Sequence, residues 1–435
     1  MQNPSSSSYS PPELNLSASL ECVAAYGIYE VDTGVCLHDR VLYRLSSHQE
    51  LEEAIYGRIF PILVLFVVAA NVLVAMVLSK KHMVTPTNVV LKYMAIADLF
   101  VGLTPLPWTM YYFTFGNNRQ EENITVLWCY IQKFSMDALP PVFHNVAMWL
   151  TVLLAGQRFI SISYPLYSRS LCNVRNVRLC TVAIGVISIL CGLPKSFDYN
   201  LELYSGYVVQ ARNSSASYVR SCMMSPTNIV TSVGENLYFS VYFWTRSLVF
   251  VVLPSVLLIG LNAGLIRGIR KAQKRKERLL KEKRTRDAQR ATDTNATSLM
   301  LVVIVTIFLV VNLPQAFFMV VMCIVQTFPN IRLGFILDGS FPLVFLLVNN
   351  MLVMATYPIN FAIYCFMSSS FRQTFRALFL SNPIFGVRSE AESSLINERR
   401  MENSAVPLVR FLPDEATVTD ENGCSKNRRN DSVFL

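Results

Sequence analysis

The stretch IYGRIFPILVLFVVAANVLVAMVLSKK, from Ile55 to Lys81, decides the fold class of this chain. Between Arg58 and Lys80 it contains no charged residue. About 20 consecutive apolar residues are enough for a helix to cross the hydrocarbon core of a bilayer. The stretch therefore predicts a membrane-spanning helix over residues 55–78, which ends at a pair of lysines.

Similar apolar stretches recur along the chain and predict seven spans. They cover residues 55–78, 89–113, 130–162, 177–193, 238–266, 299–325 and 334–366. The composition agrees, because 52% of the 435 residues are hydrophobic and 15% are charged, whereas soluble domains contain about 25% charged residues. We therefore expect an all-α membrane protein built as a bundle of seven transmembrane helices.

The distribution of lysine and arginine predicts how the bundle is oriented, because short loops rich in these residues stay in the cytoplasm. Such residues follow the first, third and fifth spans, most densely over residues 267–290. This places the N-terminus outside the cell and the C-terminus in the cytoplasm of a plasma-membrane protein. The same bias accounts for the net charge of +9, so we expect no nucleic-acid partner.

The predicted extracellular parts are the N-terminal tail over 1–54 and the loops that alternate with the cationic ones. Glycosylation sequons on this side begin at Asn15, Asn123 and Asn213. Four cysteines also face this side, where disulfides persist. A bridge between Cys129 and Cys222 would pin the long outer loop over the bundle 55–366, and one between Cys22 and Cys36 would close a small loop in the tail.

The chain lacks the motifs of a hydrolase or a nucleotide-driven pump. It contains no HExxH, Walker A, GxSxG or CxxC sequence, and its four histidines are scattered. We therefore predict that the protein is not an enzyme and uses no cofactor or metal cluster. A secondary transporter is the alternative from another class, which internal repeats and several intramembrane charges would indicate.

Polar residues inside the spans are candidates for function, because they are costly in lipid. Asp98 lies near the middle of the second span, Asn71 in the first and Asn360 in the seventh. Together they predict a buried polar network that holds water, or sodium at Asp98, and rearranges when the helices move. The alternative is a static hydrogen-bonded core.

Arg246 lies toward the outer half of the fifth span. It either snorkels to the interface or contacts a ligand in an outward-facing pocket. Acidic residues near the outer ends of spans three and seven would supply opposite charge, and aromatic side chains would supply apolar walls unless they serve only in helix packing. The candidate ligand contacts are Arg246, Asp137, Asp338, Gln315, Trp108 and Phe318.

Several motifs occur in the order typical of a rhodopsin-like G-protein-coupled receptor. They are Asn71, Asp98 in ADL, Cys129, Arg158 followed by Pro165, Pro254, Phe308 before Pro314, and Asn360 before Tyr364. The segment FMSSSFRQTFRALF resembles the short amphipathic eighth helix of these receptors, over 367–380. The segments MYYFTFGN, MWLTVLLAGQRF and TYPINFAIYCFMSSSFRQTF are similar to invertebrate sex-peptide and myoinhibitory-peptide receptors, with FMRFamide and myosuppressin receptors as the nearest alternative.

The resemblance implies a receptor that binds a short amidated neuropeptide and activates a heterotrimeric G protein, commonly an inhibitory one. A small-molecule ligand is a further alternative. The residues expected to act in the switch or in G-protein coupling are Arg158, Gln157, Asp98, Asn71, Phe308, Pro314, Asn360 and Tyr364.

One departure from the receptor pattern concerns Arg158, which in such receptors waits at the cytoplasmic end of span three for the G protein. An adjacent acid usually restrains it, but Gln157 and Thr294 carry no charge here. We therefore expect Arg158 to be weakly restrained. Further departures are Phe159 after the arginine, Asn262 in span five, Asn312 in span six, and the displaced Pro358 in span seven.

The cytoplasmic segments suggest further partners. The basic segment 267–290 is expected to attract anionic lipid and, as a continuation of span five, to touch the G protein. Residues 381–435 lack a core-forming pattern and predict a disordered tail, whose serines and threonines are candidate phosphorylation and arrestin sites. The terminal SVFL is a candidate PDZ ligand, and Cys365 is a candidate for palmitoylation or for burial in the bundle.

Overall fold

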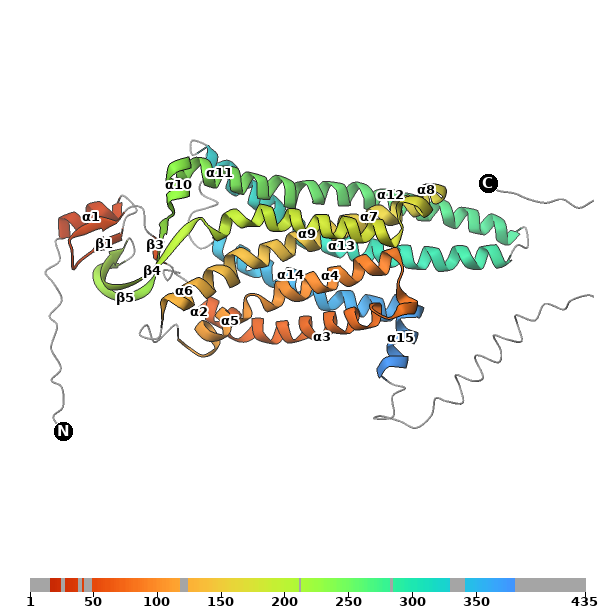
Figure 1. Ribbon diagram of the computed structural model, residues 1–435, viewed down its shortest axis with the longest axis horizontal. Helices are drawn as coiled ribbons and strands as arrows, with labels where there is room; N and C mark the ends of the chain where they lie inside the picture. The colour runs from red at the N-terminus through yellow and green to blue at the C-terminus, as the bar shows by residue number, and fades with distance from the viewer. Residues whose placement is uncertain are drawn as a thin grey trace, which may run out of the picture. The chain divides into compact units, whose positions relative to one another are not determined.

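The computed structural model describes residues 16–24, 28–37, 41–42, 49–117, 124–210, 213–281, 285–328 and 341–379. Seven helices in these ranges are long and apolar enough to cross a membrane (Figure 1). They run over Glu50–Leu78, Pro86–Thr114, Val126–Ser163, Val174–Ser196, Glu235–Lys274, Leu301–Val325 and Phe341–Phe366. The prediction of a seven-span membrane protein is confirmed, and the predicted beginning of span seven at residue 334 lies outside the described residues.

Each span consists of one or more consecutive helical segments. Spans one to three comprise α2 (Gln49–Ala54), η1 (Ile55–Ile59) and α3 (Phe60–Leu78); α4 (Pro86–Leu103), α5 (Leu106–Thr109) and η3 (Met110–Thr114); and α6 (Val126–Gln132), η5 (Lys133–Ala138) and α7 (Leu139–Ser163). Spans four to seven comprise α9 (Val174–Ser196); α11 (Glu235–Thr245), η6 (Arg246–Val252) and α12 (Leu253–Lys281); α13 (Thr285–Thr327); and α14 (Phe341–Met367). Shorter helices are η2 (Lys81–Met83), α8 (Pro165–Leu171), α10 (Asn228–Val233) and α15 (Ser369–Phe379).

Local residues explain where two of the spans begin. The Thr85 hydroxyl accepts a hydrogen bond of 3.2 Å from the backbone N–H of Asn88, and Pro86 occupies the first turn of α4. The side chain of Asn173 accepts a 2.8 Å bond from the backbone N–H of Asn176 at the start of α9. Such caps satisfy donors that have no partner within the first helical turn.

Five strands form a sheet at one end of the bundle, which is called the outer end below (Figure 1). β4 (Tyr199–Gln210) and β5 (Asn213–Pro226) make a long antiparallel hairpin between spans four and five. Strands that precede span one extend both of its edges, namely β1 (Ile28–Glu30), β2 (Val35–Leu37) and β3 (Val41–Leu42), so that the order is β2-β1-β4-β5-β3. The outer loop and part of the predicted tail are therefore folded, which the helical pattern did not predict.

Two disulfides hold the outer end together. Cys129 in α6 is bonded to Cys222 in β5, and Cys22 in α1 (Leu16–Ala24) is bonded to Cys36 in β2. Both pairings were expected from the sequence. They tie the hairpin to span three and the N-terminal helix to the sheet.

Within the described residues, four spans contain a π-helical segment toward the outer end. These segments are η1, η3, η5 and η6 in spans one, two, three and five. In a π turn the hydrogen bonds run from residue i to residue i+5, and such turns occur frequently at functional sites. The sequence pattern predicted none of them.

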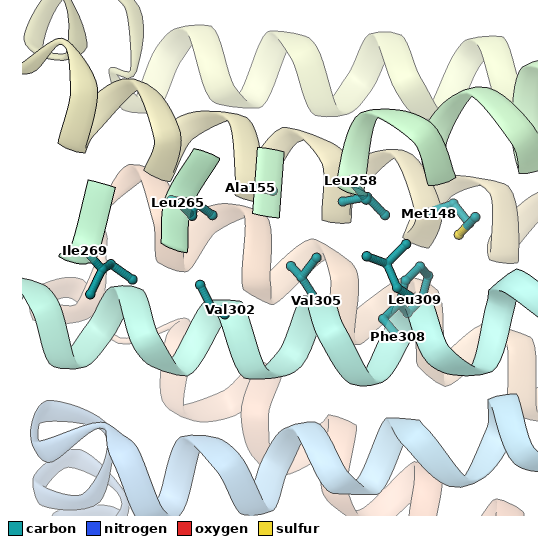
Figure 2. Packing of buried hydrophobic residues seen from close by; sticks show 9 residues of the cluster. All are labelled: Met148, Ala155, Leu258, Leu265, Ile269, Val302, Val305, Phe308 and Leu309. Carbon is teal, nitrogen blue, oxygen red and sulfur yellow. The ribbon is translucent and has the colours of Figure 1, made fainter. Parts of the chain in front are cut away.

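Apolar side chains of α7, α12 and α13 form a core that reaches from the middle of the bundle to the inner end, opposite the sheet (Figure 2). Its buried members are Met148, Ala155, Leu258, Leu265, Ile269, Val302, Val305, Phe308 and Leu309. Lipid tails are as apolar as leucine, so the burial of apolar side chains between helices gains little from the hydrophobic effect. Such contacts therefore stabilise the bundle mainly through close packing. Apolar side chains such as Leu65 and Phe66 are exposed on the outside of the bundle, as lipid-facing positions require.

Candidate functional site

A cavity of about 490 Å³ lies among the helices toward the outer end, and all seven spans contribute to its wall. Ligand sites in proteins are typically about 300–1,000 Å³ and mostly apolar, with a few polar groups that orient the ligand. Five methionines make much of this wall deformable, and they are Met136, Met319, Met322, Met351 and Met354. Size and lining therefore make this cavity the candidate ligand site.

Two opposite charges line the cavity without a direct partner. Asp137 belongs to the π segment η5 of span three, and Arg246 begins the π segment η6 of span five. Within the part of the chain that the structure describes, neither side chain takes part in a hydrogen bond or an ion pair, although Arg246 and Lys195 lie within electrostatic range of Asp137. The cavity thus offers both an acceptor and a donor to a ligand.

Neutral polar side chains complete the wall. Gln315, a predicted ligand contact, lines the cavity, and its Oε1 accepts a 3.1 Å hydrogen bond from Nδ2 of Asn349. His144 also lines the cavity, and its Nδ1 lies 3.4 Å from the hydroxyl of Tyr357. The sequence did not indicate His144, because a single histidine within a span carries no motif.

The structure places other predicted ligand contacts away from the cavity. Trp108 is fully buried and stacks on Tyr112 with ring centroids 4.7 Å apart. Phe318 is buried against Phe345, 4.6 Å away between centroids, and does not reach the cavity wall. Both aromatics pack between elements, which was the alternative for them, and Asp338 lies outside the described residues.

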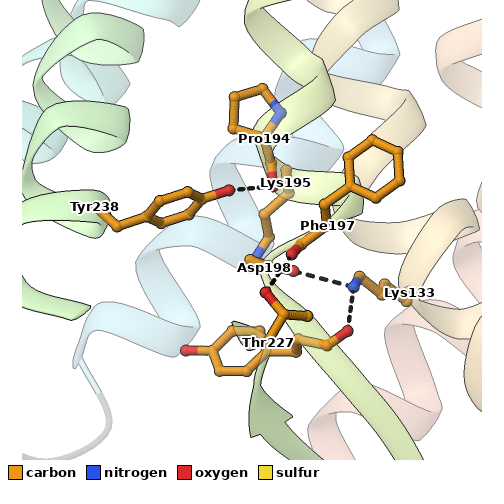
Figure 3. A network of polar contacts seen from close by, with 8 residues as sticks. Lys133, Pro194, Lys195, Phe197, Asp198, Thr227 and Tyr238 are labelled. Carbon is orange, nitrogen blue, oxygen red and sulfur yellow. Dashed lines mark hydrogen bonds and ion pairs between the residues drawn. The ribbon is translucent and has the colours of Figure 1, made fainter. Parts of the chain in front are cut away.

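A buried ionic cluster fixes the first residues of the hairpin at the cavity rim (Figure 3). Asp198 is fully buried, and its two carboxylate oxygens face Nζ of Lys133 at 3.1 Å and Nζ of Lys195 at 2.8 Å. Lys133 also donates a 2.7 Å hydrogen bond to the carbonyl of Tyr199. The cluster joins spans three and four to β4, and it went unpredicted because Asp198 and Lys133 are far apart in the sequence.

Two more hydrogen bonds close the same region. The hydroxyl of Thr227, after β5, donates to the carbonyl of Phe197 at 2.8 Å, and the hydroxyl of Tyr238 in α11 donates to the carbonyl of Pro194 at 2.7 Å (Figure 3). Both ends of the hairpin are therefore anchored to the end of span four, beside the cavity-lining Lys195.

In the described part of the chain, no direct hydrogen bond joins the predicted polar residues in the middle of the bundle to one another, and the network that holds water or sodium stays a prediction. Asp98 is buried, but Nδ2 of Asn71 donates to the carbonyl of Val67, one turn back in its own helix, at 3.0 Å. Among the described residues, Asp98 and Asn360 make no hydrogen bond. Tyr357 and Tyr364 of span seven lie within electrostatic range of Asp98. The amide of Asn71 satisfies its own helix, which leaves the carboxylate without an amide donor.

Arg158 lies at the inner end of span three without a polar partner among the described residues, and its Nε atom is buried. The side chain of Gln157 is buried as well, and neither polar atom of its amide has a hydrogen bond. The amide therefore does not hold the guanidinium. Thr294, the second neutral position, has its side chain outside the described part.

The remaining switch candidates lie where helices meet. Phe308 packs in the inner core, and Pro314 lies inside α13. Tyr364 is buried, with its ring 5.8 Å from that of Phe371 in α15 and its hydroxyl without a hydrogen bond among the described residues. The half-buried Cys365 lies at the same junction.

Some predicted sites cannot be placed. Asn15, Asn123 and the tail over 381–435 lie outside the described residues, and of Asn213 only the backbone, in β5, is described. Glycosylation, arrestin binding and PDZ binding therefore stay predictions.

Comparison with known proteins gives a consistent relationship. A sequence model of the serpentine type 7TM GPCR chemoreceptor Srw family matches residues 58–382. The chain is 58% identical over 377 residues to sex peptide receptor-related protein 2 of Caenorhabditis elegans. The matched region covers 86% of this chain and 83% of that protein. It is 33% identical over 361 residues to the sex peptide receptor of Drosophila melanogaster, covering 82% and 80%. The FMRFamide receptor of Drosophila melanogaster is more distant, at 20% identity over 80% of this chain and 57% of that protein.

Proposed function

Because the chain belongs to the serpentine Srw family of seven-transmembrane G-protein-coupled receptors, we propose that it is a cell-surface receptor for a short amidated peptide. Binding of the peptide favours one arrangement of the helices, and the inner end passes that arrangement on to a heterotrimeric G protein of the inhibitory kind. Because this family consists of receptors, we no longer consider the alternative that the protein is a transporter. The greater distance of the FMRFamide receptor places the sex peptide receptors first as a guide to the ligand.

The observation that carries the ligand class is the pair of charges without direct partners in the cavity, Asp137 and Arg246. A primary carboxamide offers an NH2 donor to the carboxylate and a carbonyl acceptor to the guanidinium. It does so without bringing a net charge into a desolvated site. A free C-terminal carboxylate would meet Arg246 favourably but would be repelled by Asp137, so the pair would select amidated peptides by disfavouring their acids.

The outer end is proposed to face the extracellular space. There the hairpin, anchored by the ionic cluster around Asp198 and by the Cys129–Cys222 disulfide, forms a fixed rim for the rest of the peptide. The inner end is proposed to present Arg158 to the G protein and the basic continuation of α12 to anionic lipid. Arrestin and a PDZ protein are the proposed partners of the C-terminal tail.

The test compares amidated peptides with their free acids on cells that express the full chain. We expect an amidated peptide of the sex-peptide or myoinhibitory group to drive inhibitory G-protein activation, and its free acid to be at least about tenfold weaker, which corresponds to ~1.4 kcal/mol. Asp137→Asn keeps the shape of the side chain but removes its charge, so the variant should bring the acid close to the amide. Arg246→Ala should weaken both peptides.

The exposed Glu202 in β4 supplies the matched control, because Glu202→Gln removes a carboxylate away from the cavity wall and should keep the preference for the amide. Arg158→Ala should bind the peptide normally and fail to activate the G protein. If no amidated peptide activates the receptor, the proposal is wrong. If one does but Asp137→Asn keeps the wild-type preference, the role assigned to Asp137 is wrong.

A further inference from the structure

The inner end of span three is seated in a groove of span five that two glycines create. A Cβ atom added to Gly264 of α12 would lie 2.7 Å from Cε2 and 2.9 Å from Cδ2 of Phe159. A Cβ atom added to Gly268, one turn further along α12, would lie 2.7 Å from Cγ2 of Ile162. Distances under 3.0 Å are essentially never seen for real Cβ atoms. Both side chains of α7 can therefore take these positions only because the opposite residues are glycines.

Phe159 directly follows Arg158 in the sequence. The guanidinium has no hydrogen-bond or ion-pair partner among the described residues, and Gln157 beside it also makes no hydrogen bond. Neither the neighbouring Gln157 nor any other side chain in the described part of the structure therefore restrains Arg158 through a polar contact. The contacts that hold this turn of α7 against α12 are the packing contacts of Phe159 and Ile162 in the groove.

The groove is joined to span six as well as to span three. Nδ2 of Asn262 in α12 donates a 2.9 Å hydrogen bond to Oγ1 of Thr306 in α13. Phe159 and Ile162 pack against the inner core, in which Leu265 of α12 lies beside residues of α13 (Figure 2). The groove of α12 is therefore in contact with both neighbouring spans, through this hydrogen bond and through shared packing.

We propose that Phe159 and Ile162, seated in the groove of Gly264 and Gly268, are the positioning residues that hold Arg158 where this structure places it, and that this arrangement is the inactive one. The packing contact then replaces the polar restraint that the amide of Gln157 does not supply. When α12 moves away from α7, the seat opens and Arg158 becomes available to the G protein. This proposal rests on the proposed coupling to a G protein.

The competing explanation is that the glycines serve only to pack two helices closely, as small residues commonly do in membranes. In that case a methyl group in the groove would lower stability and leave the inactive arrangement favoured. The two explanations differ in ligand-free activity, which is the quantity to measure.

Two variants make the same chemical change one helical turn apart. Gly264→Ala forces the ring of Phe159 from its seat, whereas a Cβ added to Gly260 meets no atom within 4 Å. Purified full-length receptor is placed in lipid nanodiscs with an inhibitory G protein and no peptide. We expect Gly264→Ala to raise nucleotide exchange about tenfold, because an active state of a few per cent leaves that room, and Gly260→Ala to match the wild type.

A second pair of variants removes the ring of Phe159 instead of displacing it. Phe159→Ala should raise ligand-free exchange as Gly264→Ala does. The double variant Phe159→Ala/Gly264→Ala should show no further rise, because the atoms that the new methyl group would displace are gone. Should Gly264→Ala fail to fold, Phe159→Ala decides alone, since truncation introduces no clash.

A distance measurement tests the packing without any G protein. Spin labels on cysteines introduced at the exposed positions Tyr167 in α8 and Lys274 in α12 report the separation of spans three and five. The background changes the native cysteines outside the two disulfides, other than the buried Cys323, to serine, namely Cys172, Cys180, Cys191, Cys365 and Cys424. We expect a longer mean distance in Gly264→Ala and in Phe159→Ala, and the wild-type distance in Gly260→Ala.

The outcomes separate the two layers of the proposal. If Gly264→Ala and Phe159→Ala leave both ligand-free exchange and the label distance unchanged, or if Gly260→Ala changes them equally, the packing restraint is refuted. If the distance changes as expected and no G protein responds to any form of the receptor, the groove holds α7 as inferred and the coupling proposed above fails.

Discussion

Gln157 is the residue at which the restraint on Arg158 can be changed most directly. Its buried amide makes no hydrogen bond, and the neighbouring guanidinium of Arg158 has no polar partner in the part of the chain that the structure describes. In Gln157→Asp a carboxylate would accept from that guanidinium, and a hydrogen bond to a charged group contributes about 1.5–3 kcal/mol. We expect ligand-free nucleotide exchange to fall roughly tenfold, since ~1.4 kcal/mol changes an equilibrium by that factor.

The control is Gln157→Asn, which has the shape of aspartate without its charge and should keep the wild-type exchange. Because the packing of Phe159 and the new ion pair would act on the same arginine, Gln157→Asp should also lower the raised exchange of Gly264→Ala. Unchanged or higher exchange in Gln157→Asp would show that Arg158 is not the restrained group.

Individual site residues could be predicted from the sequence where they carry a charge, because a charged side chain is costly in lipid. Asp137 and Arg246 stood out because charges inside a span need a reason, and the structure places both on the cavity wall. Trp108 and Phe318 carried no such signal, because an aromatic side chain packs between helices as readily as it lines a pocket. Lys195 and Asp198 were not singled out from the sequence, because no motif marks either residue, although they form an ion pair three residues apart.

Among the elements, the outer sheet could not be predicted from the local pattern. β1 and β3 are short, and they pair with a hairpin that lies across four spans in the sequence. Strand pairing over such a distance depends on where the helices place the hairpin. The π segments were unpredictable for a related reason, since one residue more in a turn leaves the hydropathy of a span unchanged.

The hairpin gives a prediction at the same scale. Asp198→Asn leaves Lys133 buried without its countercharge, and removing one partner of a buried ion pair typically costs about 3–5 kcal/mol. We expect the variant to unfold at a clearly lower temperature in detergent than the wild type. Its affinity for the peptide should fall as well, because the ion pairs that fix the rim of the cavity are lost.

Glu202→Gln again serves as the control, because it removes an exposed carboxylate from the same strand. A second comparison replaces all three charges by apolar residues, as in Lys133→Met/Lys195→Met/Asp198→Leu, and should recover part of the lost stability because no unpaired charge stays buried. If Asp198→Asn unfolded at the temperature of Glu202→Gln, the cluster would not be what anchors the hairpin.

For the whole molecule, the environment limits the architecture more tightly than any motif does. In lipid every backbone polar group must be satisfied within the protein, and a single continuous stretch of about 20 apolar residues achieves this as a helix. For this reason the number of spans could be predicted from hydropathy alone. The structure of the parts outside the lipid could not be predicted in this way, because strands can pair freely there. The cation-rich connections after spans one, three and five then predict one side for all of them.

That sidedness is the last prediction, and the coupling of an outer cavity to an inner arginine depends on it. A tag at the N-terminus should be stained on intact cells, and a tag at the C-terminus only after permeabilisation. Removal of N-linked glycans should lower the apparent mass of the wild type and leave that of the triple variant Asn15→Gln/Asn123→Gln/Asn213→Gln unchanged. Asn295 also begins a sequon, Asn295-Ala-Thr, but it lies on the cationic side. The variant Asn295→Gln should therefore behave like the wild type. Two tags found on the same side would be incompatible with seven spans, and with a receptor that carries a signal between its two ends.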